Sequence, residues 1–246
     1  MSKSEQMIQG RVATAGRGAD PGSGFTLIEL LTVISIIALL AAIGASMAGV
    51  AGRKATESKL RSERDKLVTA IESYHADFNQ YPPDNAANGV NVNPVINQLY
   101  YELTGTVSTN QGRVYLSSDA GERLTETAIK TAFHGAGGFV NAAAYPEKPK
   151  NYLRDLKPSQ KRDINLPGGA EIELLVAPAN WPRKWQAQAP LRGLSTDWRV
   201  LEINPWNYVS TKPTNNPVSF DLWAVWATGR VVNGTNEYRF FGNWKD

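Results

Sequence analysis

The amino-acid sequence predicts an α+β fold: a long N-terminal helix packed on a C-terminal head with a small antiparallel sheet. Three observations predict it. Residues 25–52 form an almost uncharged apolar run, the following segment has apolar residues at helical spacing, and strand-like segments gather near the C-terminus. A chain of 246 residues, 42% of them hydrophobic, is long enough to bury a sizeable core.

The first half of the predicted helix is the run Phe25–Gly52, whose single ionisable side chain is Glu29. A helix of that length extends for about 42 Å, against a hydrocarbon core of about 30 Å. We therefore expect residues 25–52 to span a membrane. Two alternatives stay open: a buried helix of a soluble protein, and a secretory signal cleaved after Ser46-Met47-Ala48.

The second half, residues 53–80, is expected to be an amphipathic helix of the head. Its apolar side chains recur at one helical face, at Leu60, Leu67, Ile71, Tyr74 and Phe78. Tyr81-Pro82-Pro83-Asp84 should stop it, because proline cannot continue a helix and restricts the residue before it. One helix is therefore expected from about Phe25 to Gln80.

The globular head should comprise residues 81–246. Two further helices are expected, at Val95–Leu103 and around Leu124–Phe133, and Pro146–Gly169 is interpreted as a surface loop. The expected strands are Glu171–Val176, Trp198–Ile203, Phe220–Ala227, and a hairpin of Val231-Val232 with Glu237–Phe241 around Asn233-Gly234.

Composition excludes several classes of function. The balance of 26 basic and 23 acidic residues gives a net charge of +3, too mild to predict a nucleic-acid partner. The absence of cysteine excludes disulfides, thiolate metal sites and a cysteine nucleophile. No catalytic triad surrounds His75 or His134, and Gly135-Ala136-Gly137-Gly138 lacks the lysine of a phosphate-binding loop. We expect no enzyme activity.

Glu29 is the informative residue of the apolar run. A carboxylate carried to the centre of a bilayer costs about 2.5–3.5 kcal/mol, and no basic residue lies within one helical turn of it. Its partner is therefore expected to be a new positive charge or a group of another molecule.

The residues around it, Gly24-Phe25-Thr26-Leu27-Ile28-Glu29-Leu30-Leu31, resemble the processing signature of type IV pilins and type II secretion pseudopilins. The resemblance implies that residues 1–24 are a leader removed by the prepilin peptidase, which cleaves between Gly24 and Phe25. It also implies N-methylation of Phe25 and pairing of Glu29 with the N-terminal amine of a neighbouring subunit.

Four shorter matches resemble the major (G-type) pseudopilin. They are Tyr81-Pro82, Asn204-Pro205-Trp206-Asn207-Tyr208, Ser219-Phe220-Asp221-Leu222-Trp223 and Gly242-Asn243-Trp244. The resemblance covers residues 24–104 and 203–244. Residues 105–200 have no counterpart in it and are expected to be an enlarged insertion in the head.

Major pseudopilins hold calcium in a C-terminal loop, which raises the question of a calcium cofactor here. Two acidic positions of that loop correspond to Thr228 and Phe240, so Asp221 and Glu237 are the remaining candidate ligands. We expect no cofactor, and expect packing of the tryptophans to hold the loop instead. All seven lie in the last third of the chain: Trp181, Trp185, Trp198, Trp206, Trp223, Trp226 and Trp244.

The resemblance implies a structural subunit of a periplasmic pseudopilus that drives protein export by type II secretion. Its partners would be other copies, minor pseudopilins, the peptidase that also methylates, and the inner-membrane platform with its ATPase. The chain would cross the inner membrane once, with its N-terminus cytoplasmic and its head periplasmic. The positive-inside rule favours the opposite orientation, because basic residues such as Arg53 and Lys54 follow the apolar run. The alternatives are a type IV pilin for adhesion, motility or DNA uptake, and a membrane-tethered carbohydrate-binding module.

Overall fold

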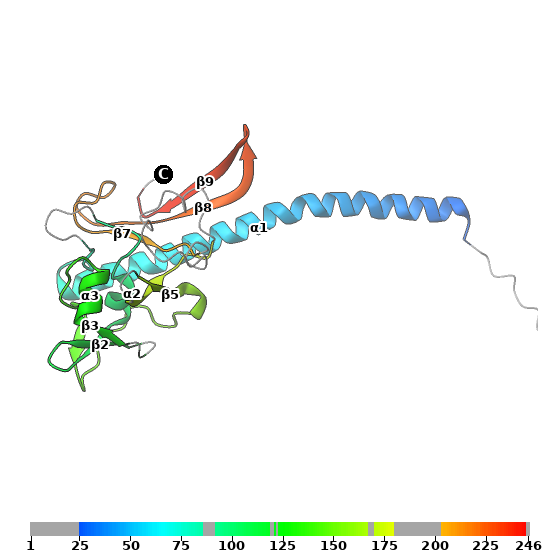
Figure 1. Cartoon of the computed structure of the whole chain (residues 1–246). Helices are drawn as coiled ribbons and strands as arrows, with labels where there is room; N and C mark the ends of the chain where they lie inside the picture. Colours follow the sequence, from blue (N-terminus) through cyan, green and yellow to red (C-terminus); the bar gives the residue numbers. More distant parts are fainter. Residues whose placement is uncertain are drawn as a thin grey trace, which may run out of the picture. The chain divides into compact units, whose positions relative to one another are not determined.

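The computed structural model describes residues 25–85, 92–118, 121, 123–166, 170–179 and 203–244 (Figure 1). The side chains of residues 44–48 are not among those described. The chain divides into two compact units, Met1–Gly49 and Val50–Asp246. The predicted leader, including Gly24, lies outside the described residues.

Helix α1 extends from Leu27 to Phe78 and contains 52 residues. It ends where Asn79 adopts a φ of 53° and donates its N–H to the carbonyl of His75 at 2.8 Å. Asparagine tolerates this left-handed conformation better than most residues. Tyr81-Pro82-Pro83 follows, so the helix stops two residues before the predicted Gln80.

The membrane-spanning part of the predicted fold is wrong for the described part of the chain. Among the described residues, none of the helices combines the length and the apolar character needed to cross a bilayer.

In the second unit, α1 buries one stripe of side chains in the head. Leu60, Leu67, Ile71 and Tyr74 are buried, with Ile71 and Tyr74 fully inaccessible. Burying one such side chain contributes about 1.5–3 kcal/mol. The spacing of these residues keeps them on one face, which explains why the helix binds the head along a single line.

The other elements of the head are short. They are α2 (Leu99–Thr104), β1 (Thr106–Thr109), β2 (Val114–Ser117), β3 (Arg123–Thr125), α3 (Glu126–Ala132), β4 (Ala142–Ala144), the 3₁₀ turn η1 (Pro158–Gln160), β5 (Lys161–Asn165), β6 (Glu171–Leu175), β7 (Asn207–Val209), β8 (Asp221–Val232) and β9 (Thr235–Gly242).

The single small antiparallel sheet of the prediction is also wrong. The described strands form three sheets, in the orders β3-β2-β1-β4, β5-β6 and β7-β8-β9. The first sheet is mixed, because β1 pairs antiparallel with β2 and parallel with β4. A parallel pair needs a crossover connection, and β2, β3 and α3 provide it. This sheet lies within residues 105–200.

Three local predictions between residues 95 and 169 are corrected. The expected helix Val95–Leu103 is only Leu99–Thr104, and the segment around Leu124–Phe133 begins as strand β3 before α3. The expected loop Pro146–Gly169 contains η1 and β5. The expected strand Trp198–Ile203 lies, except for its last residue, outside the described residues.

The hairpin around Asn233-Gly234 is confirmed. Strands β8 and β9 pair antiparallel and form the long hairpin at the red end of the chain (Figure 1). Asn233 and Gly234 have φ values of 51° and 75°. Two consecutive positive φ values suit the twist of a two-residue hairpin turn, and Asn-Gly adopts them at low cost.

One buried carboxylate links three parts of the head. Glu102 of α2 is fully inaccessible and accepts hydrogen bonds from Tyr74 Oη of α1 and from the backbone N–H groups of Val140 and Asn141, each at 2.9 Å. Burial raises the pKa of Glu102, although the three donors act in the opposite direction. This carboxyl group fixes the segment before β4 against α1.

Candidate functional site

The first turn of α1 places Glu29 against its own helix N-terminus. Thr26 donates both its backbone N–H and its side-chain hydroxyl to Glu29 Oε2, each at 2.8 Å. In return, the Glu29 N–H donates to Thr26 Oγ1 at 3.3 Å. This reciprocal arrangement is a capping box, which satisfies N–H groups that a helix start would otherwise leave unpaired.

The capping box gives Glu29 a partner within its own helix, and the expected pairing with a new positive charge or another molecule stays a prediction. The pattern Thr26-Leu27-Ile28-Glu29 carried the signal, because a threonine followed three residues later by glutamate is the sequence signature of such a box. The donors are a backbone N–H and a hydroxyl group rather than a positive charge. Both bonds end on Oε2, so Oε1 takes no part in the cap.

The surface of this first segment is apolar on all sides. Phe25 is 83% exposed and Leu27 80%, and large apolar side chains remain at least half exposed as far as Ile43 on most turns. Between Leu27 and Ile43, the two residues with a hydroxyl group donate to carbonyls of their own helix. Thr32 donates to Glu29 at 2.8 Å, and Ser35 donates to Leu31 at 2.7 Å. Polar groups therefore add little to what this surface offers a partner.

Asp221, the first calcium candidate, is only 2% exposed and is surrounded by amide donors. It accepts the backbone N–H groups of Thr214, Asn215 and Asn216 at 2.8–2.9 Å, and the side-chain amides of both asparagines at 3.0–3.2 Å. Asn243 ties the same loop to the C-terminus by accepting the N–H of Leu222 and donating to the carbonyl of Phe220. Asp221 thus organises the loop before β8 through amides.

Glu237, the second candidate, lies far from Asp221. Asp221 begins β8, whereas Glu237 lies on β9 and accepts the hydroxyl of Thr228, near the other end of β8, at 2.6 Å. At about 3.3 Å per residue, the two carboxylates are separated by roughly 20 Å along the strand. The structure therefore does not bring the two candidate ligands together. In the part of the chain that the structure describes, no three histidine or acidic side chains form a group that could hold a metal ion.

The described tryptophans are mostly packing residues. Trp206 and Trp226 are 2% and 8% exposed. Trp223 and Trp244 are half-buried, with ring centroids 5.8 Å apart, and Trp244 covers Gly242 so closely that a Cβ there would lie 2.6 Å from its ring. These contacts hold the end of β9 against the start of β8. Trp181, Trp185 and Trp198 lie outside the described residues.

Comparison with known proteins gives no further identification. No protein-family model, no curated protein and no solved structure matches the chain.

Proposed function

We propose that this chain is a pseudopilin-like subunit of a type II secretion pseudopilus, which assembles by packing the N-terminal segments of many copies together. The observation that carries the proposal is the first part of α1. Its large apolar side chains are exposed in a single chain, and a helix that is apolar all round requires burial against something else. Other copies of the same segment would bury it.

The geometry of Glu29 supports the same proposal. Its Oε2 is held by Thr26, which fixes the side chain, while Oε1 is outside the cap. A carboxylate oriented in this way can accept a hydrogen bond from the N-terminal amine of a neighbouring subunit beginning at Phe25. Partial burial of such a pair would favour one packing register over others.

The proposal extends to processing and partners. The prepilin peptidase would cleave between Gly24 and Phe25 and methylate Phe25, and the filament would include minor pseudopilins and meet the secretion platform with its ATPase. The inner-membrane location stays a prediction. A type IV pilin would use the same segment, so the machinery that co-purifies with filaments decides between the two.

The test is to image filaments from cells that produce the full chain, and to identify its N-terminus by mass spectrometry. Leu40→Asp places a charge on the exposed apolar segment and should abolish filaments. Val218→Asp is the matched control, because Val218 is an exposed apolar residue of the head, and it should assemble as wild type does. Equal assembly of the two variants, or a native N-terminus after Ala48, would overturn the proposal.

Glu29→Val provides the second arm. It should leave the amount of chain unchanged and reduce filament number or order, because the acceptor for the N-terminal amine is lost. Glu72→Val, at an exposed glutamate on the same helix, should have no such effect.

A further inference from the structure

A hollow of about 380 Å³ lies between the start of the head's part of α1 and the β8–β9 hairpin. Its charged lining residues are Arg53, Lys54, Glu57, Arg230, Glu237 and Arg239, with Val50 and Trp226 providing apolar surface. The four cations and two carboxylates leave a surplus of two positive charges. Its volume is in the range of small-molecule sites, about 300–1,000 Å³.

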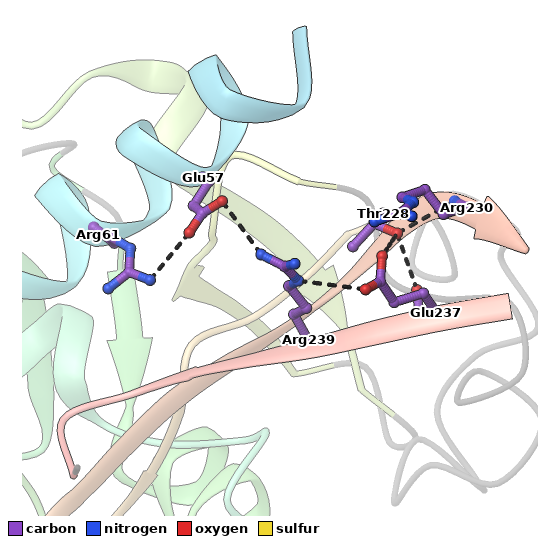
Figure 2. A network of polar contacts seen from close by, with 6 residues as sticks. All are labelled: Glu57, Arg61, Thr228, Arg230, Glu237 and Arg239. Carbon is purple, nitrogen blue, oxygen red and sulfur yellow. Dashed lines mark hydrogen bonds and ion pairs between the residues drawn. The ribbon is translucent and has the colours of Figure 1, made fainter. Parts of the chain in front are cut away.

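Both carboxylates of the hollow are already paired within the chain. Glu57 contacts Arg61 at 3.0 Å and Arg239 at 3.4 Å, and Glu237 contacts Arg239 at 3.7 Å (Figure 2). Thr228 donates a hydrogen bond from its hydroxyl to Glu237. These contacts connect helix α1 to the β8–β9 hairpin, which form the two walls of the hollow. Arg239 is the residue that contacts a carboxylate on each wall.

The remaining three cations of the hollow differ from Arg239 in their contacts. Among the described residues, Arg53, Lys54 and Arg230 have no ion pair and no side-chain hydrogen bond. Arg53 and Lys54 are on the helix wall, whereas Arg230 is on the hairpin wall. An anion in the hollow would therefore meet positive charge from both walls.

The backbone contributes to the position of Arg230. The β8–β9 register shifts between Ala227 and Val231, and Gly229 within that shift has a φ of 73°. A bulge with glycine in this conformation re-aims the neighbouring side chains. The Arg230 N–H donates to Thr228 Oγ1 at 3.2 Å, which ties the bulge to the Thr228–Glu237 contact. Glu237 has a lowered pKa because of the Thr228 hydrogen bond and the charges of Arg239 and Arg230.

We propose that this hollow binds a phosphate group, either of a free phosphate ester or of an anionic lipid headgroup, through Arg53, Lys54 and Arg230. Two guanidinium groups and an ammonium suit a phosphate, which accepts several charge-assisted hydrogen bonds at once. One carboxylate would balance only one of the three charges and fill little of the volume. The inference does not depend on filament assembly.

The test measures anion binding by the purified full chain in a non-ionic detergent, with glycerol phosphate as the free probe. The double variant R53A/R230A should weaken binding by at least about tenfold. Its matched control, R123A/K148A, removes the same charge at exposed residues far from the hollow in the sequence and should bind as wild type does. Folding is checked by circular dichroism, and among the described residues none of these four side chains has a hydrogen bond or an ion pair.

A second arm uses flotation with vesicles of phosphatidylcholine, with or without phosphatidylglycerol. Binding through the apolar segment is common to both lipids, so only the gain with phosphatidylglycerol reports on the hollow. If R53A/R230A loses the gain with phosphatidylglycerol but still binds glycerol phosphate, the ligand is a lipid headgroup. If it loses glycerol phosphate binding but keeps that gain, the ligand is a free phosphate ester. The proposal would be overturned if the wild type bound in neither arm, or if R123A/K148A lost as much binding as R53A/R230A. It would also be overturned if the three cations promoted association between copies of the chain without binding an anion.

Discussion

At the start of strand β8 the carboxylate of Asp221 is buried and saturated by amide donors, whereas near the strand's other end the charges are exposed and unbalanced. Asp221 accepts from three backbone N–H groups and two side-chain amides. Glu237 accepts from Thr228 and contacts Arg239, while Arg230 nearby has no ion pair among the described residues.

The difference separates structure from recognition. Where every polar group has a partner inside the chain, removing an acceptor leaves buried donors unpaired, and the free energy of unfolding decreases. Where charges of one sign remain unpaired at a hollow, removing them should change the free energy of unfolding little and weaken ligand binding instead. Three predictions test this contrast, starting with the largest effect.

Asp221→Ala should produce the largest loss of stability. It leaves the N–H groups of the 214–216 turn without an acceptor, so we expect about 3 kcal/mol of destabilisation. For a chain of this size, that lowers the Tm by about 6–12 °C. Thermal unfolding followed by circular dichroism measures it. Asp163→Ala, at an exposed aspartate of β5, should change the Tm little, and similar losses in both variants would contradict the contrast.

The sequence predicts these two ends unequally. The Asn233-Gly234 turn is a local signal, and it fixes the hairpin because both residues accept positive φ. No local sequence motif indicates the environment of Asp221. The loop around it is also held by Asn243, which lies more than twenty residues later in the sequence. The Thr26–Glu29 capping box is again a local signal, because its two side chains and backbone N–H groups lie within one helical turn.

The sheets show why other parts of the fold could not be predicted. Ala142–Ala144 lacks the β-branched and aromatic residues typical of strands, yet pairs parallel with β1. Strand β5 buries only Ile164, so its sequence has the polar character of a loop. For β4, pairing with the distant strand β1 decides the structure, whereas β5 is held by pairing with β6, the next strand along the chain. The proline stop after α1 was predictable because it acts on the backbone of its own neighbours.

Glu237→Gln should have a smaller, pH-dependent effect. The pKa of Glu237 is lowered in the folded chain, chiefly by the Thr228 hydroxyl and then by Arg239 and Arg230. The ionised form therefore favours the folded state at neutral pH, and this contribution is lost as the pH falls from about 4.5 through the lowered value. The stability difference between wild type and the variant should be largest above pH 5 and shrink below pH 4.5.

Urea unfolding at a series of pH values measures that difference. Glu147→Gln, at an exposed glutamate outside the hairpin, is the control and should show no comparable change over the same range. A difference for Glu237→Gln that grows as the pH falls would have the wrong sign for a lowered pKa and would refute the Thr228–Glu237 contact.

Calcium removal should have the smallest effect. An ion at 100 times its Kd would stabilise the folded chain by about 2.7 kcal/mol, which corresponds to a rise in Tm of roughly 5–10 °C for a chain of this size. Asp221 has no oxygen left without an amide donor, and Glu237 lies roughly 20 Å away along the strands. Calcium and chelator should therefore give the same Tm for the full chain in detergent, within the error of the measurement. If calcium raised the Tm by several degrees, and Asp221→Asn removed that rise, the carboxylate would be a ligand and the saturated end of β8 would be a binding site after all.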